Sequence, residues 1–309
     1  MKWERVDSIY QPLPTSIKIF RTNKPLDDKP NIAYYIEADL SDKQLIFQTD
    51  TTLGRRLTPS QYFERASKND SESKTPLVVV NTTFFSFATN QNLNVVVKDG
   101  KRVSNNVHSF PGRGKDTLMY RHAFAGAIGI NKNRKADVAW IFTESTRKYP
   151  YAIQQSFPVF KDSVSAIHYK TFRKKLHASK ISSRKWKMNA AVGGGPVLIQ
   201  GGEISISNNE EYRFPGKAID DRHPRTAMGY TADNKLIILV VEGRNSGVAE
   251  GASLKHLAMM MKEIGCEEAL NLDGGGSSCM VVNGKNTIRP SDKDAQQRPV
   301  PAVFIISKK

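Results

Sequence analysis

Short apolar runs separated by turn residues recur along the whole chain and predict a protein built mainly of β-strands. Alternating apolar and polar positions favour a strand at 32–39, and the unbroken apolar run 77–80 favours a strand buried on both faces. Paired runs around short turns predict hairpins at 95–103, 124–141, 197–206 and 226–241. Further strands are expected at 17–19, 269–272, 280–282 and 300–306.

Two segments carry the spacing and the end signals of helices. Thr58 can cap a helix whose first residue is Pro59, and Gln61 completes a capping box, which predicts a helix to about residue 68. Ser253 caps a second helix at 254–264, whose apolar residues share one face, and Gly265 is typical of a helix end. The pattern therefore predicts an α+β fold: a sheet-dominated single domain of short strands and hairpins with a few packed helices.

The ends of the chain and its loops set the expected domain organisation. Residues 1–30 are rich in Pro, Lys and Asp and predict an N-terminal arm, followed by one domain at 31–309. A polar loop is expected at 68–76. No apolar run approaches the length of a membrane span, and the first five residues lack the apolar core of a signal peptide.

Charge is the unusual feature of the composition. A hydrophobic content of 39% and a charged content of 25% are ordinary for a soluble domain, but the net charge is +16. Such an excess points to acidic partners rather than to a fold. Basic residues crowd into 161–187, where Asp162 is the only acid and Tyr169, Phe172 and Trp186 are interleaved. This pattern is typical of polyanion or nucleic-acid surfaces, and it equally fits a plain solvated helix.

The two cysteines, Cys266 and Cys279, form no Cys-x-x-Cys pair, which disfavours zinc and thioredoxin-type chemistry. One disulfide between them and two free buried thiols both remain compatible with the sequence.

The segment 271–278, Asn-Leu-Asp-Gly-Gly-Gly-Ser-Ser, has the composition of a small polar site at a strand end. Three successive glycines are expected where backbone must approach another group closely or where φ is positive. The segment lacks the Lys-Ser/Thr ending of a P-loop and the spacing of a nucleophile elbow. Successive N–H groups in such a turn can bind an anion, although a tight structural turn is the alternative.

Two further segments bring charge to strand ends. Residues 222–225, Arg-His-Pro-Arg, place two guanidinium groups near an imidazole, and guanidinium groups bind phosphate well. Residues 242–244, Glu-Gly-Arg, pair an acid with a base. A surface loop and a structural salt bridge are the alternatives for these segments. A metal site at Asp220, Asp221 and His223 is disfavoured because three ligands within four residues rarely converge on one ion.

Together with Asn81-Thr82-Thr83-Phe84-Phe85, Gly193-Gly194-Gly195-Pro196 and Arg298-Pro299-Val300-Pro301, these segments occur in one order that resembles the phosphodiester glycosidase family. The resemblance covers roughly residues 77–306. Its bacterial relatives are often described as exopolysaccharide-associated. One departure stands out: Thr82 and Thr83 occupy positions where relatives usually carry two glycines, which bears on the shape of the pocket.

The resemblance implies hydrolysis of a sugar–phosphate bond in a phosphodiester, with release of sugar and a phosphomonoester. A phosphate leaving group needs little protonation but benefits from nearby cations and N–H groups. The implied catalytic residues are Asp273, as nucleophile or base, and Glu242, as a second carboxylate. The implied substrate-binding residues are Asn81, Gly194, Gly195, Arg222, His223, Arg225, Arg244, Asn271, Gly274, Gly275, Gly276, Ser277, Ser278 and Arg298.

The resemblance also suggests the partner and location of the protein. The expected partner is a phosphorylated glycan or another sugar-1-phosphodiester, for example a phosphodiester of N-acetylglucosamine. Nucleic acid is disfavoured as a partner. The expected location is extracytoplasmic. No cofactor or metal is implied, and a metal requirement stays open. Two alternatives remain: a non-catalytic binder of anionic glycan or nucleic acid through the basic segment, and a hydrolase of ordinary polysaccharide.

Overall fold

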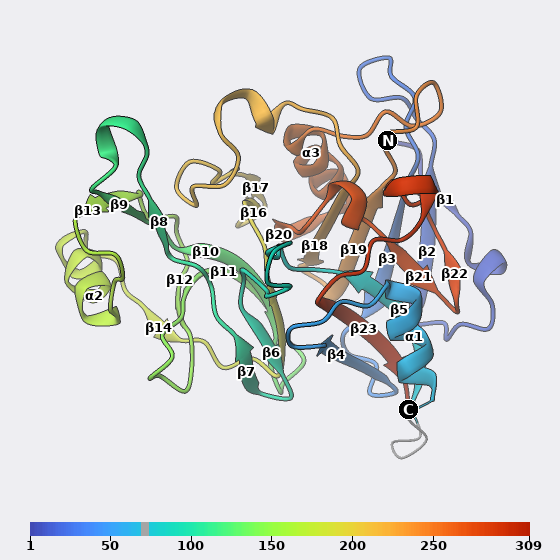
Figure 1. The fold of residues 1–309 in the computed structure, drawn as a ribbon. Coiled ribbons are helices and arrows are strands. Elements are labelled where there is room, and N and C mark those ends of the chain that lie inside the picture. Colours follow the sequence, from blue (N-terminus) through green and yellow to red (C-terminus); the bar gives the residue numbers. More distant parts are fainter. Residues whose placement is uncertain (69–73) are drawn as a thin grey trace.

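A computed structural model describes residues 1–68 and 74–309, in which antiparallel sheets dominate (Figure 1). The largest sheet contains, in spatial order, β1 (Glu4–Arg5), β2 (Ile17–Thr22), β3 (Ala33–Asp39), β19 (Lys235–Val241), β18 (Arg225–Thr231), β20 (Cys266–Asn271), β16 (Val197–Gln200) and β17 (Glu203–Ile204). Ile17 and Ile19 of β2 are completely buried, so part of the N-terminal segment belongs to this sheet.

A second sheet contains β22 (Lys285–Asn286), β21 (Met280–Val282), β5 (Thr75–Asn81), β23 (Ala302–Lys308) and β4 (Leu45–Thr51). A third contains β14 (Arg184–Lys185), β12 (Tyr151–Ile153), β11 (Ala136–Phe142), β10 (Ala125–Ile130), β15 (Ala190–Gly193), β6 (Val96–Lys98) and β7 (Lys101–Ser104). A small sheet joins β13 (Phe160–Asp162), β9 (Tyr120–His122) and β8 (Ser109–Pro111).

The described residues contain three α-helices: α1 (Pro59–Ser67), α2 (Tyr169–Ala178) and α3 (Leu254–Ile264). The predicted capping box of α1 is formed. As expected, Ser253 caps the N-terminus of α3 and Gly265, with φ 96°, caps its C-terminus. The α+β, sheet-dominated fold is therefore confirmed. Most of the predicted loop 68–76 lies outside the described residues.

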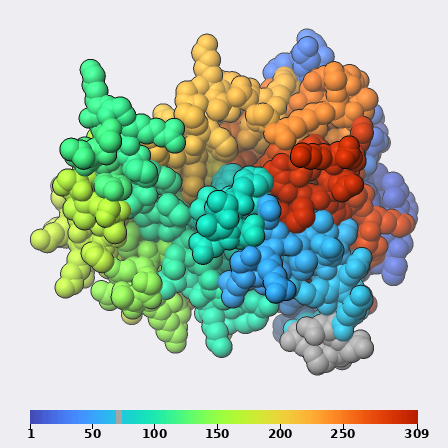
Figure 2. All heavy atoms as spheres, viewed as in Figure 1, coloured from blue at the N-terminus to red at the C-terminus, as the bar shows by residue number. Residues whose placement is uncertain are grey.

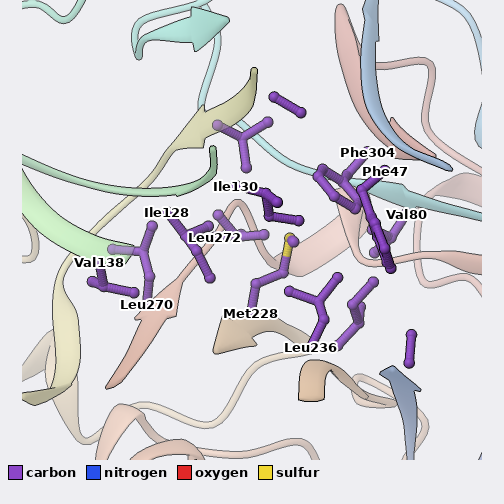
Figure 3. Packing of buried hydrophobic residues seen from close by; sticks show 14 of the residues in the cluster. Phe47, Val80, Ile128, Ile130, Val138, Met228, Leu236, Leu270, Leu272 and Phe304 are labelled. Atoms are coloured by element: carbon purple, nitrogen blue, oxygen red, sulfur yellow. The ribbon is translucent and has the colours of Figure 1, made fainter. Parts of the chain in front are cut away.

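The core explains why the central strands are continuously apolar. Along β19, Leu236, Ile238 and Val240 pack into a cluster shared with the other two large sheets, whereas Ile237 and Leu239 pack against α3 on the opposite face. Because successive side chains point to opposite faces, a strand covered on both sides must be apolar throughout. Figure 3 shows the shared cluster, to which Val80 of β5 and Ile128 of β10 also contribute.

Candidate active site

The candidate site lies where β20 leaves its sheet and the chain crosses to β21 of the second sheet. The N–H of Leu272 donates to the Thr226 carbonyl, and the N–H of Asp273 donates to the Thr82 carbonyl, each over 2.8 Å. These two bonds connect the chain first to β18 and then to the end of β5. Asp273 is thus fixed at the junction of two sheets, followed by the single 3₁₀ turn Gly275–Ser277.

Asn81 holds this junction together. Its side-chain amide donates to the main-chain carbonyl of Asp273 over 2.6 Å, and its Oδ1 accepts from the N–H of Cys279 over 3.1 Å. Thr226 Oγ1 lies 2.9 Å from Asn81 Oδ1 and 3.1 Å from Ser278 Oγ. Asn81 and Ser278 are both buried. These two predicted substrate-binding residues therefore contact the protein rather than an open surface.

The Asp273 carboxyl has an unusual environment for an acid. Burial raises its pKa to about 7, against the opposing effects of the Ser277 hydroxyl, the Arg298 guanidinium and the N–H of Gly274. The residue nevertheless keeps partial solvent exposure. A carboxyl that titrates near neutral pH, within reach of solvent, is suited to proton transfer or to nucleophilic attack.

Close approach of other groups explains the three glycines. A Cβ on Gly276 would lie 2.3 Å from Nη2 of Arg298, and one on Gly274 would lie 2.8 Å from the Pro224 carbonyl oxygen. Gly275 has φ +61°, and a Cβ there would lie 3.0 Å from Nη2 of Arg244. Two guanidinium groups thus pack directly on the backbone of the turn that follows Asp273.

The N–H groups of this turn are mostly used by the protein itself, which favours the tight structural turn over the anion-binding nest, and substrate binding by residues 274–278 stays a prediction. Those of Gly275, Ser277 and Ser278 donate to the carbonyls of Pro224, Gly274 and Gly275. The N–H of Gly274 faces the Asp273 carboxyl. An anion bound here would therefore be held mainly by side-chain cations.

Arg244 and Arg298 are the cations placed to do so. Arg298 donates two hydrogen bonds to Asp292, of 2.9 and 3.0 Å, and its guanidinium lies 5.3 Å from the centre of the Phe87 ring. Arg244 is exposed, at φ 60°, and forms no hydrogen bond or ion pair within the described part of the chain. It borders a hollow of about 230 Å³, together with Arg289 and Ser291. The Ser291 hydroxyl donates to the Gly275 carbonyl, which joins this hollow to the turn.

A larger hollow, of about 750 Å³, lies between β4 and α1 and contains none of the predicted site residues.

In the Arg-His-Pro-Arg segment, residues 222–225, both arginines form hydrogen bonds within the protein. Arg222 donates to the Leu26 carbonyl and to Asp27, and none of its hydrogen bonds reaches the glycine turn. Arg225 is 3% exposed and donates to the carbonyls of Ala252 and Asp221, and burial lowers its pKa to about 10. His223 is partly exposed, as is Arg222, and its imidazole forms no hydrogen bond with the described residues. Burial, with the nearby charges of Arg225 and Arg244, lowers its pKa, so the imidazole is neutral at neutral pH.

Glu242 is buried and both of its carboxylate oxygens are occupied. Oε1 accepts from the Asn245 amide and Oε2 accepts from the N–H of Arg289, each over 3.0 Å. No hydrogen bond joins Glu242 to the Asp273 turn in the described part of the chain. Its role as a second catalytic carboxylate stays a prediction. Its hydrogen bonds hold Asn245 and Arg289, which line the hollow that Arg244 borders.

The second glycine triplet also serves close backbone packing. Asn271 and Gly195 exchange two hydrogen bonds: the N–H of Gly195 donates to the Asn271 carbonyl over 2.8 Å, and the Asn271 amide donates to the Gly195 carbonyl over 2.7 Å. A Cβ on Gly194 would lie 2.4 Å from the Asn271 carbonyl oxygen. Asn271 and Gly194 therefore position β20 rather than face an open surface.

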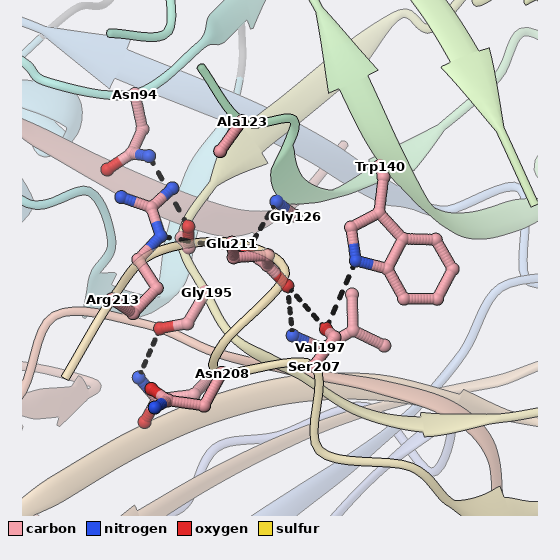
Figure 4. Close-up of polar contacts among 12 residues, drawn as sticks. Asn94, Ala123, Gly126, Trp140, Gly195, Val197, Ser207, Asn208, Glu211 and Arg213 are labelled. Atoms are coloured by element: carbon pink, nitrogen blue, oxygen red, sulfur yellow. Dashed lines mark hydrogen bonds and ion pairs between the residues drawn. The ribbon is translucent and has the colours of Figure 1, made fainter. Parts of the chain in front are cut away.

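Sequence reasoning missed a buried ionic pair beside this triplet (Figure 4). Glu211 accepts hydrogen bonds of 2.7 Å from the N–H groups of Gly126 and Val197 and from the Ser207 hydroxyl. Burial raises its pKa, an effect that the Arg213 guanidinium 3.6 Å away opposes. Both residues lie in a polar loop with no periodicity, so only their acid-base alternation could have drawn attention to them.

Within residues 1–68 and 74–309 the structure shows neither a metal-binding cluster nor a disulfide. The described residues contain no group of three or more His, Cys, Asp or Glu side chains arranged to hold a metal ion. Asp220 instead pairs with Lys255 over 2.7 Å. Cys266 and Cys279 are free and buried.

Comparison with known proteins identifies the family of this chain. Residues 74–307 match the sequence profile of the family described as phosphodiester glycosidase. The chain belongs to the phosphodiester glycosidase family. The threonines that depart from the family pattern are buried, and their hydroxyls point inward, Thr82 to the Ala302 carbonyl and Thr83 to Asn92.

Individual relatives match over shorter stretches. The N-acetylglucosamine-1-phosphodiester α-N-acetylglucosaminidase of Mus musculus is 31% identical over 103 residues, which is 31% of this chain and 20% of the mouse protein. An uncharacterized SPβ prophage-derived protein of Bacillus subtilis is 38% identical over 71 residues, 23% of this chain and 11% of the bacterial protein. The matched region thus spans a fifth or less of these relatives.

The structural match covers much more of the chain than these sequence matches do. The catalytic domain of the zebrafish enzyme of the same name, in a form auto-inhibited by its pro-peptide, superposes with a TM-score of 0.63 at 19% identity. That match covers 97% of this chain and 86% of the zebrafish chain.

Proposed function

We propose that this protein hydrolyses the bond between the anomeric carbon of a sugar and the phosphate of a phosphodiester. One observation carries the proposal. Asp273 has a partly exposed carboxyl whose pKa burial raises to about 7, and the guanidinium groups of Arg244 and Arg298 contact the turn that follows it. Family membership and the names of the vertebrate relatives support N-acetylglucosamine as the first sugar to test.

Asp273 acts at the sugar in this proposal. Its carboxylate either attacks the anomeric carbon or removes a proton from the water that attacks it. The bond between the anomeric carbon and the bridging oxygen breaks, and its electron pair goes to that oxygen, which leaves as part of a phosphomonoester. Because phosphate disperses this charge, no strong general acid is needed at the leaving oxygen.

The cations act at the phosphate. The leaving group gains negative charge as the bond breaks, and guanidinium groups fixed nearby stabilise that charge more in the transition state than in the substrate. Arg298 is held by Asp292, and Arg244 has no competing ion pair within the described residues. The neutral imidazole of His223 beside Arg244 contributes a hydrogen bond to substrate.

The buried polar residues position these groups in the proposal. Asn81 fixes the backbone of Asp273, and Glu242 braces the segment that carries Arg289. A single catalytic carboxylate is sufficient because the leaving group is already acidic.

The proposed setting is glycan metabolism outside the cytoplasm, which rests on the family resemblance. No helix among the described residues is long and apolar enough to cross a membrane.

A panel of three substrates tests the proposal: an alkyl N-acetylglucosamine-1-phosphodiester, the corresponding 1-phosphomonoester, and an alkyl α-N-acetylglucosaminide without phosphate. We expect free sugar from the diester, at a rate that exceeds the glycoside rate by at least about 10²-fold, the effect of losing one charge-stabilising contact. Equal rates on the diester and the glycoside would contradict a phosphate-recognising site. No turnover of any of the three would overturn the proposed activity on N-acetylglucosamine.

A further inference from the structure

The positive charge of the chain is concentrated in one part of the fold. Residues 98–187, called here the basic lobe, contain 20 Lys and Arg but 5 Asp and Glu, and so carry +15 of the +16 net charge. The rest of the chain is almost balanced. The basic lobe comprises β7 to β14 with α2 and forms the left side of the molecule in Figures 1 and 2. A uniformly basic protein would not be divided in this way.

Helix α2 shows the concentration most clearly. Lys170, Arg173, Lys174 and His177 follow the i, i+3, i+4, i+7 spacing of one helix face, and all four are exposed. The opposite face buries Tyr169, Phe172 and Leu176 against the sheet. The helix contains no acid, and none of Lys170, Arg173, Lys174 and Lys175 forms an ion pair with the residues described.

This arrangement costs stability, which argues for a use. Like charges four residues apart repel, as Lys170 and Lys174 do. Lys170 also lies in the first turn of α2, where the helix dipole disfavours a cation. A solvated face without a partner needs neither feature, and mixed charges would keep it soluble at lower cost.

The burial of the aromatic residues within 161–187 indicates which kind of polyanion the surface can bind. Proteins that bind single-stranded nucleic acid stack bases on exposed rings. Here Phe172 and Trp186 are completely buried and Tyr169 is 8% exposed. The interleaved aromatics that favoured a nucleic-acid surface in the sequence therefore face inward. The three interleaved rings therefore offer no stacking platform beside the charges of α2, which suits a chain of phosphates whose other groups are not aromatic.

The basic lobe is also connected directly to the candidate site. Its sheet continues through β15, which leads without interruption into Gly193, Gly194 and Gly195 and their hydrogen bonds with Asn271. Asp273 follows two residues later. Charge on the lobe raises the local concentration of an anionic polymer near the site.

We propose that the outer face of the basic lobe binds a glycan polymer with phosphates in its backbone, one repeat of which is the diester cleaved beside Asp273. The second clause rests on the proposed function; the first does not. The lobe contacts backbone phosphates of the polymer, and Arg244 and Arg298 beside the glycine turn contact the scissile one.

Binding to inorganic polyphosphate tests the surface. We expect wild-type protein to bind with a steep salt dependence. The triple variant Lys170→Gln, Arg173→Gln, Lys174→Gln should bind at least about tenfold more weakly, with a log–log salt slope shallower by about 2, as three lost phosphate contacts on a flexible chain predict. The matched control Lys24→Gln, Lys29→Gln, Lys43→Gln removes the same charge from exposed positions outside the lobe and should stay within about twofold of wild type.

The outcomes separate the alternatives. Equal losses in the two triple variants would show attraction by net charge alone and overturn the surface, as would a wild type that binds no polyphosphate at low salt. An oligothymidylate with the same number of phosphates should bind within about threefold of polyphosphate. Binding more than about tenfold tighter would instead identify a nucleic-acid surface, since one base stack is worth that much.

Failure of the lobe and failure of the proposed activity give different results. The lobe variant should hydrolyse the small alkyl diester normally, because it leaves the Asp273 site intact, while its KM for a polymeric phosphodiester substrate rises. If wild type binds polyphosphate but cleaves no diester, the activity is wrong and the surface stands.

Discussion

The side-chain amide of Asn81 donates a hydrogen bond of 2.6 Å to the main-chain carbonyl of Asp273, across 192 residues of sequence. This bond joins the end of β5 to the end of β20, and so ties the position of the carboxyl to the packing of two sheets. Asn81 also accepts from the N–H of Cys279, at the far side of the glycine turn. One amide therefore fixes both ends of the segment that carries the proposed chemistry.

Replacing Asn81 should affect turnover more than substrate binding. Asn81→Ala leaves the Asp273 carbonyl without its side-chain donor and the Cys279 N–H without its side-chain acceptor, and unsatisfied buried groups cost about 1–3 kcal/mol each. We expect kcat to fall about tenfold with KM changed less than about twofold, measured by steady-state kinetics, because Asp273 shifts while the cations stay. Thr82→Val is the matched control, since it removes one buried hydrogen bond next door, to the Ala302 carbonyl. An equal loss of kcat in both variants would reduce Asn81 to general stability.

The two carboxylates should respond very differently to amide substitution. Asp273→Asn removes the proposed nucleophile or base, and we expect kcat/KM on the alkyl diester to fall at least about 10³-fold with the fold intact by circular dichroism. Glu242→Gln weakens a brace and should cost less than about tenfold. Comparable losses in the two variants would restore Glu242 as a second catalytic carboxylate, and near-normal activity of Asp273→Asn would remove Asp273 from the mechanism.

Activity should rise with pH through about 7. Burial raises the pKa of Asp273 to about 7, so the carboxyl is mostly protonated below that pH and ionised above it. A nucleophile or base works only when ionised, so kcat/KM should increase across this range and then level off. A profile that instead falls through pH 7 would assign Asp273 as a general acid. The pH dependence should be absent from the residual activity of Asp273→Asn.

Adding one methyl group to the glycine turn should disable the site. The Cβ of Gly276→Ala would lie 2.3 Å from Nη2 of Arg298, so the guanidinium, whose Nη2 also donates to Asp292, must shift from its place on the turn. We expect kcat/KM for the diester to fall at least about tenfold, as for other losses of a charge-stabilising contact. Gly201→Ala is the control: it has space for a Cβ but φ +57°, so it should cost stability without lowering kcat/KM. Normal activity of Gly276→Ala would exclude Arg298 from the reaction.

Local signals in the sequence were sufficient for most of the fold. The capping box at Thr58 and Gln61 and the left-handed Gly265 depend on a few adjacent residues, so they appear in the structure as predicted. The unbroken apolar run of β5 likewise reflects burial on both faces. The way the three large sheets share one buried cluster was beyond prediction, because it depends on contacts between residues far apart in sequence.

The candidate site shows the same division. Asp273 and the glycines were found because their composition is itself unusual, and close backbone approach proved to be the reason for the glycines. The sequence could not show where the turn's N–H groups donate, because one acceptor is the carbonyl of Pro224, which lies just before β18 and far from the turn in the sequence. Arg222 and Arg298 have identical chemistry in the sequence, but tertiary packing directs Arg222 to Asp27 and Arg298 to the turn. Side-chain direction of this kind cannot be deduced from residue type.

The position of isotopic oxygen after hydrolysis in H₂¹⁸O tests the central claim most directly. Cleavage of a sugar-1-phosphodiester gives the same sugar and phosphomonoester whether the carbon–oxygen or the phosphorus–oxygen bond breaks. If Asp273 acts at the anomeric carbon, mass spectrometry should find ¹⁸O in the anomeric hydroxyl of the sugar, analysed before it exchanges with solvent, and none in the phosphomonoester. Label in the phosphomonoester would show attack at phosphorus and contradict a glycosidase mechanism.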